Sequence, residues 1–183
     1  MTCIAAILDK DAIWMGCDSM ISSGDRSSMI DSKIIKKGNI IMGFAGGLRD
    51  INLLKFGFDA PNQDKKMSDY EYVATVFSSS IRERLKKFGA LNVQDREETG
   101  NAHILMGYKK RLYQMYFDFG AERIEGVNFY ASGSGASLAL GSLYSTENSA
   151  LTPEERIRLA LSAAEKFTRS VGGPFIIEQL KFS

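Results

Sequence analysis

Apolar and polar positions change their period several times along the chain, and these changes divide it into blocks of strands and blocks of helices. Apolar runs on either side of the polar stretch Asp9-Lys10-Asp11 predict a hairpin with a three-residue loop. A second strand pair is expected to turn at Lys37-Gly38. The strands expected from such patterns are residues 3–8, 12–18, 33–36, 39–45, 102–108, 111–117, 124–131 and 174–179.

Helical periods occupy the intervening segments. The clearest helix is expected to begin at Ser68, because Ser68 and Glu71 have the spacing of a capping box and apolar residues then recur at helical intervals as far as Gly89. Thr152 followed by Pro153 and two glutamates predicts another helix start. The remaining helices are expected over 48–56 and 136–145, and residues 90–100 are interpreted as a polar loop.

The order of these elements favours an α+β fold. Strands and helices alternate in blocks rather than singly, which argues against a doubly wound parallel sheet. Two antiparallel sheets packed between two helix pairs would bury every apolar face, so we expect a four-layer αββα sandwich. With no linker or repeat in 183 residues, the prediction is one domain, 1–183.

Composition narrows the range of partners. The chain has 23 Lys and Arg against 22 Asp and Glu, a balance that indicates no nucleic-acid partner. Its apolar runs are too short for a membrane span, and two cysteines provide neither a disulfide framework nor a zinc site. We therefore expect a cytoplasmic protein with no metal and no cofactor.

One histidine limits the possible catalytic mechanisms. A Ser-His-Asp or Cys-His mechanism would have to use His103, the only histidine of the chain. His103 lies in an expected strand, and the chain contains no Gly-x-Ser-x-Gly elbow, so we interpret it as structural. An enzyme of this sequence would need another base.

The first residues offer such a base. In the expected hairpin register, Thr2 faces Asp18, and Cys3 faces Cys17 on the opposite side of the sheet. Removal of Met1 would leave Thr2 with a free α-amino group, whose pKa of about 7.7–8.0 suits it to accept the hydroxyl proton. The nucleophile and its base would then belong to one residue.

Two glycine-rich segments could contact a substrate. Gly46-Gly47 lies between a strand and a helix, where backbone N–H groups could bind an oxyanion, although a tight turn without a ligand is the alternative. Gly133-Ser134-Gly135 is only superficially similar to a phosphate loop, because no Gly-Lys-Ser/Thr follows it.

Taken in order, these segments resemble the proteasome β-subunit family, and most closely its bacterial relative, the heat-shock-locus V type peptidase subunit. The matching segments are Thr2, Gly16-Cys17-Asp18-Ser19, Lys33-Ile34, Gly43-Phe44-Ala45-Gly46-Gly47 and Gly133-Ser134-Gly135. The resemblance implies an αββα threonine peptidase inside a self-compartmentalising ring. It also implies peptide or unfolded-protein substrates and an ATPase unfoldase as partner.

The resemblance further implies catalytic roles for five residues. Thr2 would be the nucleophile, and its amino group the base. Lys33 would favour the ionised hydroxyl through its positive charge, and Asp18 would hold Lys33. The Gly46 N–H would bind the oxyanion, and Ser134 would steady the terminal amine.

Three more residues are implied in substrate binding. Ser22 and Gly47 would bind the peptide backbone as an added strand, and Phe44 would shape the first specificity pocket.

Some positions depart from the family pattern. Met20 replaces the arginine that often follows Asp-Ser, and Thr168 and Val171 stand where many members have Asp and Ser near the amine. A retained Met1 would leave an inactive ring scaffold, which is one alternative. An amidase for small amides that uses Thr2 or Cys3 is another. Because the chain starts so close to Thr2, we expect a homo-oligomeric ring.

Overall fold

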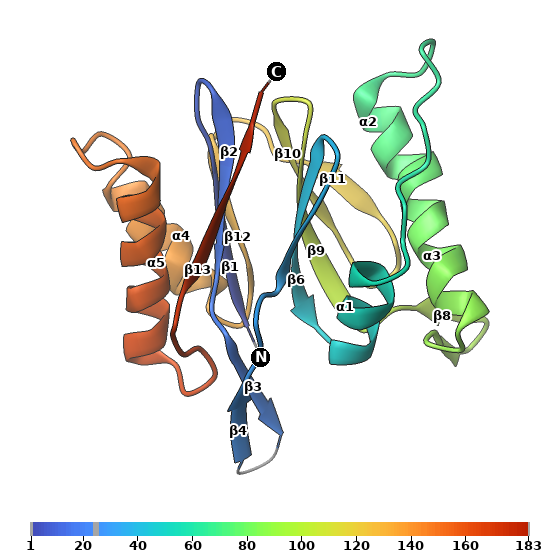
Figure 1. Ribbon diagram of the computed structural model, residues 1–183, viewed down its shortest axis with the longest axis horizontal. Helices are drawn as coiled ribbons and strands as arrows, with labels where there is room; N and C mark the ends of the chain where they lie inside the picture. Colours follow the sequence, from blue (N-terminus) through green and yellow to red (C-terminus); the bar gives the residue numbers. More distant parts are fainter. Residues whose placement is uncertain (1, 24–25, 183) are drawn as a thin grey trace.

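Two β-sheets stack face to face, and helices cover the outer side of each sheet (Figure 1). In this computed structural model, residues 2–23 and 26–182 are described. The strand orders are β12-β1-β2-β13 and β11-β10-β9-β6-β5, and every neighbouring pair is antiparallel. The predicted α+β, four-layer αββα architecture is confirmed.

The first sheet carries the N-terminal hairpin. Its strands are β1 (Cys3–Leu8), β2 (Ala12–Cys17), β12 (Phe129–Gly133) and β13 (Ile176–Lys181), and its outer face is covered by α4 (Ala136–Ser145) and α5 (Pro153–Phe167). At the start of α5, Thr152 and Glu155 form the predicted capping box with both hydrogen bonds present.

The second sheet consists of β5 (Ile34–Lys37), β6 (Ile40–Gly46), β9 (Ala102–Tyr108), β10 (Arg111–Met115) and β11 (Ala121–Arg123). Its outer face is covered by α1 (Leu48–Lys55) and by a long helical segment made of α2 (Asp69–Glu71), the π-helical η1 (Tyr72–Phe77) and α3 (Ser78–Lys87). This segment begins at Ser68 as predicted, although its π-helical part was not foreseen. The small hairpins are β3 (Met20–Ser23) with β4 (Arg26–Met29), and β7 (Asn92–Gln94) with β8 (Glu97–Thr99).

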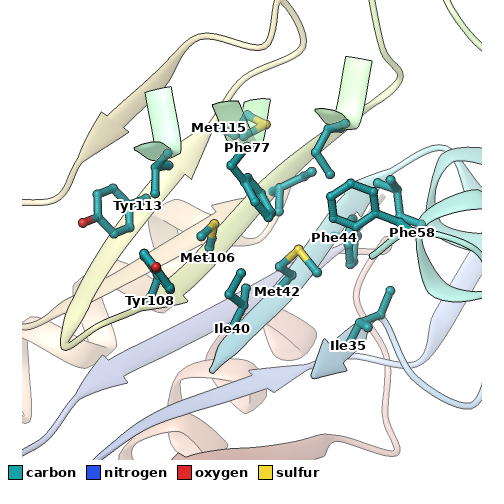
Figure 2. Close-up of a cluster of buried hydrophobic side chains, with 14 of the residues drawn as sticks. Ile35, Ile40, Met42, Phe44, Phe58, Phe77, Met106, Tyr108, Tyr113 and Met115 are labelled. Carbon is teal, nitrogen blue, oxygen red and sulfur yellow. The ribbon is translucent and has the colours of Figure 1, made fainter. Parts of the chain in front are cut away.

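Three apolar layers hold the four structural layers together. Along β1, Cys3 and Ala5 pack toward α4 and α5, whereas Ile4 and Ala6 pack toward the other sheet. The third layer lies between the second sheet and its helices, and Figure 2 shows its side chains, among them Phe44. Both faces of each sheet are therefore covered.

The register of the first hairpin differs from the prediction by one residue. Ile4 lies opposite Cys17 and Leu8 opposite Ile13, and the Asp9 N–H donates to the Ala12 carbonyl at 2.9 Å, so the turn has two residues, Lys10 and Asp11, rather than three. The Asp18 N–H donates to the Cys3 carbonyl at 3.2 Å and the Cys3 N–H donates to the Asp18 carboxylate at 3.0 Å, so Asp18 lies opposite Cys3 and not Thr2. A one-residue shift reverses the faces of a strand, so the expected pairing of Cys3 with Cys17 is wrong.

Two other expectations needed correction. The segment expected to be a loop at 90–100 contains the β7–β8 hairpin, whose turn places Asp95 and Arg96 at φ of 49° and 72° without a glycine to signal it. The strand expected over 124–131 begins only at Phe129 and is preceded by β11. Within residues 2–23 and 26–182, no helix combines the length and apolar character that crossing a membrane requires.

Candidate active site

Thr2 lies where β1 begins, against the end of β12. It is buried, with 3% of its surface exposed. Its carbonyl oxygen accepts hydrogen bonds from the Gly135 N–H and the Ser134 hydroxyl, both at 3.3 Å. Gly133 permits this approach, since its φ is +97° and a Cβ there would lie 2.3 Å from the Thr2 carbonyl oxygen. The β12–α4 connection thus fixes Thr2, the residue directly before β1.

The ammonium group of Lys33 is the centre of the site. Lys33 directly precedes β5, and only 1% of its surface is exposed. Its Nζ donates to Thr2 Oγ1 at 3.0 Å, to Asp18 Oδ1 at 2.7 Å and to the Met20 carbonyl at 2.7 Å. Since an ammonium group has three N–H donors, all three are used and the charge is fixed beside the Thr2 hydroxyl.

Asp18 compensates that charge. Its carboxylate is completely buried, and Oδ1 also accepts the Cys3 N–H at 3.0 Å. Oδ2 faces the Gly172 N–H at 3.4 Å, in the loop between α5 and β13. A buried ion pair of this kind requires that each partner be well hydrogen-bonded, and this one meets the condition. Asp18 therefore orients Lys33 while Lys33 contacts the Thr2 hydroxyl.

The nitrogen of Thr2 lies against the Ser134 hydroxyl, which in turn contacts the Ser170 hydroxyl. The Thr2 N–H donates to Ser134 Oγ at 3.2 Å, and Ser134 Oγ is 3.0 Å from Ser170 Oγ. The sequence analysis placed Thr168 and Val171 at the positions where many family members have a supporting Asp and Ser, and counted both as departures from the family pattern. Thr168 bonds back to a carbonyl at the end of α5, and Val171 packs in the apolar core, so Ser170 between them is the residue that was missed. A polar position one residue before Val171 was the available signal.

Gly46 ends β6 on the other side of Thr2. A Cβ there would lie 2.0 Å from the Asn101 carbonyl oxygen, so only glycine fits this backbone. The Gly47 N–H donates to that same Asn101 oxygen at 2.7 Å, and the Asp50 carboxylate accepts the Asn101 N–H at 2.6 Å. The Gly47 N–H is therefore used within the fold, whereas exposed Gly46 lies at the wall of a cavity that Thr2 also lines.

A model of the proteasome subunit family matches residues 1–173. The chain belongs to the proteasome subunit family. Its fold is that of a proteasome-type N-terminal nucleophile hydrolase, which confirms the resemblance seen in the sequence.

Solved structures agree with this membership. The chain is similar to the BPH protein of Thiobacillus denitrificans in complex with epoxomicin, with a TM-score of 0.80, 21% identity and coverage of 99% of both chains. It is also similar to eukaryotic HslV from Trypanosoma brucei, with a TM-score of 0.69, 16% identity and coverage of 98% of this chain and 99% of that one. For Anbu (ancestral beta-subunit) from Yersinia bercovieri, the TM-score is 0.68 and the identity is 15%, with coverage of 98% of this chain and 81% of that one. No curated protein matches the chain significantly.

Of the substrate-binding residues inferred from the family, Phe44 is not brought to the Thr2 network. Phe44 is completely buried among the side chains between the second sheet and its helices, so it lines no surface pocket in this chain (Figure 2). Ser22 lies on β3 opposite Ser27, and its side chain lies outside the described part of the structure.

The two cysteines of this proteasome-family chain are poor nucleophiles. Burial raises the pKa of the Cys3 thiol to about 12 and that of Cys17 to about 11, so neither forms a thiolate near neutral pH. Burial also lowers the pKa of His103, whose ring packs 3.8 Å from the Phe117 ring. Across the described ranges, no group of three His, Cys, Asp or Glu side chains could hold a metal ion.

Proposed function

We propose that this protein is a threonine-type peptide hydrolase in which Thr2 becomes the nucleophile after removal of Met1. The observation that carries the proposal is the contact of Lys33 Nζ with Thr2 Oγ1 at 3.0 Å, made by a buried ammonium that Asp18 holds at 2.7 Å. A positive charge fixed at the hydroxyl oxygen stabilises the negative charge that develops there on deprotonation.

The reaction would begin with proton transfer from the Thr2 hydroxyl to its own α-amino group. The contact between Ser134 Oγ and the Thr2 nitrogen, at 3.2 Å, orients that amine. Oγ1 then forms a bond to the carbonyl carbon of a peptide, and the carbonyl oxygen takes the negative charge. The Gly46 N–H, at the wall of the same cavity, is the donor we propose for this oxyanion.

Two further steps would complete the cycle. The amine returns its proton to the leaving nitrogen as the carbon–nitrogen bond breaks, which leaves an ester on Thr2. Water, deprotonated by the same amine, then attacks the ester and restores the hydroxyl. In this scheme Lys33 acts through the position of its ammonium group, which Asp18 holds at 2.7 Å.

Membership of the proteasome family supports the broader setting. We infer a homo-oligomeric ring in the cytoplasm that acts on peptides or unfolded proteins, served by an ATPase partner. The BPH structure contains epoxomicin, an epoxyketone, which makes this class of compound a suitable probe of the Thr2 site.

The proposal is tested by comparing Thr2→Ala with Thr2→Ser on a panel of fluorogenic peptides. Loss of the hydroxyl is expected to lower kcat/KM by at least about a thousandfold, whereas serine keeps a nucleophile and should retain measurable turnover. Intact mass must first show that Met1 is absent from each protein. Peptide cleavage by Thr2→Ala at the wild-type rate would refute the proposal.

A further inference from the structure

Two consecutive glycines follow one another where β6 ends, and their own side chains cannot hold them in place. Gly46 has a φ of +155°, and neither glycine carries a Cβ that would restrict its backbone. The pairing of β6 with β9 also ends here, with Gly46 opposite Ala102. An oxyanion donor in this segment therefore depends on contacts made by neighbouring residues.

The hydrogen bonds on either side of Gly46 define the direction of its N–H. Successive N–H groups of a strand point to alternate edges. The Phe44 N–H donates to the Lys33 carbonyl at 3.0 Å, whereas the Gly47 N–H donates to the Asn101 carbonyl, beside β9, at 2.7 Å. Gly46 comes two residues after Phe44 and one before Gly47. Its N–H therefore points to the edge of β6 on which Lys33 lies, which is also the side of the proposed nucleophile.

Asn101 holds both glycines with its backbone. Its carbonyl oxygen accepts the Gly47 N–H and lies so close to Gly46 that a Cβ there would be 2.0 Å away. Its own N–H donates to Asp50 Oδ2 at 2.6 Å, in the first turn of α1. A shift of Asn101 would therefore move the peptide units next to the Gly46 N–H.

The side chain of Asn101 fixes that backbone to a second part of the fold. Its Oδ1 accepts a hydrogen bond from the Asn92 amide of β7 at 2.6 Å, and its Nδ2 donates to the Ala90 carbonyl at 3.3 Å. Ala90 is buried, and its N–H donates to the Leu85 carbonyl of α3 at 2.9 Å. Asn101 thus joins the end of β6 to α1, to α3 and to the β7–β8 hairpin.

We propose that Asn101 is a positioning residue of the peptide hydrolysis: its side-chain amide holds the backbone that aims the Gly46 N–H at the oxyanion. The inference rests on the proposed reaction at Thr2 and adds to it the support of the oxyanion donor. Since the oxyanion forms only as the reaction proceeds, this support acts on kcat and leaves KM nearly unchanged.

The test compares Asn101→Ala with the wild type on the fluorogenic peptides, after intact mass has shown that each protein lacks Met1. The variant keeps the backbone contacts and loses the amide. Its kcat should fall about tenfold, less than the hundredfold or more that follows loss of an oxyanion donor, and its KM should change less than about twofold. An unchanged kcat, or a loss of kcat/KM caused by KM alone, would overturn the inference.

Gln63→Ala is the matched control, because Gln63 makes the same kind of link at the opposite end of β9. Its Nε2 donates to the Met67 carbonyl at 2.8 Å, and its Oε1 accepts the hydroxyl of Tyr108, the last residue of β9, at 2.7 Å. Both variants should lower the midpoint of urea unfolding, but only Asn101→Ala should lower kcat. An equal fall of kcat in both would indicate a general loss of stability and contradict a positioning role.

A second variant, Asn92→Ala, covers the possibility that Asn101→Ala misfolds. Asn92 is exposed and provides one hydrogen bond to the Asn101 side chain, so its loss should lower kcat about threefold. The double variant should have the kcat of Asn101→Ala alone, because both changes break the same link. Wild-type kcat in Asn92→Ala, or fully additive effects, would contradict the proposed role.

The same assays distinguish failure of this inference from failure of the proposed function. Peptide cleavage that Thr2→Ala abolishes and Asn101→Ala leaves at the wild-type kcat would refute the role of Asn101 alone. Cleavage by Thr2→Ala at the wild-type rate, or no cleavage by wild type that lacks Met1, would refute the hydrolase and this inference with it.

Discussion

Two buried aspartates support opposite sides of the candidate site, and their surroundings differ. Asp18 and Asp50 are exposed by 0% and 1%. Asp18 has a cation, Lys33, at 2.7 Å and accepts backbone N–H groups as well. Asp50 accepts the Asn101 N–H at 2.6 Å, but its Oδ1 has no partner among the described residues, and burial raises its pKa above the ordinary 3.8.

The contrast separates two ways of holding a catalytic group. On the nucleophile side, Asp18 and Lys33 form a buried pair in which the charge itself acts on Thr2. On the oxyanion side, Asp50 fixes Asn101, whose carbonyl fixes Gly47 and so the end of β6. The first arrangement needs ionised groups, whereas the second needs only hydrogen bonds and shape. Substitutions should therefore affect the two sides differently.

The largest effect is expected for Asp18→Asn. The variant would leave the buried Lys33 charge without its counter-charge, which should lower the free energy of unfolding by about 3–5 kcal/mol. Peptide hydrolysis should fall by at least about a hundredfold, because Lys33 is no longer held at Thr2. Urea unfolding and a fluorogenic peptide assay measure the two effects.

Glu178→Gln is the matched control for that variant. It breaks the Lys36–Glu178 pair, which has the same 2.7 Å separation but is exposed by 44% and 38%. Its cost should stay below about 1 kcal/mol. If Asp18→Asn cost no more than Glu178→Gln, the buried pair would have no special role.

An intermediate effect is expected for Gly46→Ala on the oxyanion side. The new Cβ would meet the Asn101 carbonyl oxygen at 2.0 Å, so the backbone must shift, at a cost of about 1–3 kcal/mol. Hydrolysis should fall by about a hundredfold, because the oxyanion donor moves. Thermal unfolding and kcat measurements test this.

Gly38→Ala tests the effect of backbone strain without a clash between the new Cβ and another atom. Gly38 also has a positive φ, +56°, but no atom lies within 4 Å of an added Cβ. The variant should lose about 1 kcal/mol of stability and keep its activity. Equal loss of activity in both alanine variants would contradict the assigned role of Gly46.

A smaller effect is expected for Asp50→Asn. The free energy of unfolding of this variant should lie within about 1 kcal/mol of the wild-type value. The reason is that the wild-type carboxylate is buried and, among the described residues, no cation lies at hydrogen-bond distance from it. Above pH 3.8 the unfolded chain loses the Asp50 proton before the folded protein does, so wild-type stability should fall as pH rises through the window up to the raised pKa. Between pH 3 and pH 7, the free energy of unfolding of the variant should rise relative to that of the wild type as the pH increases. A relative decrease would contradict this sign.

The smallest effect is expected for Ser170→Ala. Ser134 keeps its contacts with the Thr2 nitrogen and carbonyl oxygen when the Ser170 hydroxyl is removed. Hydrolysis should decrease by less than about tenfold, in proportion to one hydrogen bond. A loss as large as that of Thr2→Ala would instead place Ser170 in the reaction itself.

These residues also show how much of the fold and of the candidate site could be predicted from the sequence. The alternation of apolar residues predicted the layers, and the resemblance to proteasome β-subunits implied the cluster of Thr2, Asp18, Lys33 and Ser134 that the structure brings together. The exact hairpin register escaped prediction, because Asp9-Lys10-Asp11 contains no glycine to distinguish a two-residue from a three-residue loop.

Other features depended on tertiary packing. Ser170 can be identified only where the α5–β13 loop folds back onto Ser134. Phe44 has the same local pattern whether it lines a pocket or fills a core, and here it fills the core. Such outcomes depend on contacts between residues far apart in the sequence, which local periodicity does not encode.

The intact mass of the purified protein, before and after incubation with a peptide epoxyketone, tests the central role of Thr2 most directly. The compound requires both the hydroxyl and a free α-amino group on the same residue. The expected result is a chain without Met1 that gains one adduct, with no adduct on Thr2→Ala. A chain that lacks Met1 and still gains no adduct, or an equal adduct on Thr2→Ala, would contradict Thr2 as the nucleophile; a retained Met1 without an adduct would favour an inactive ring scaffold.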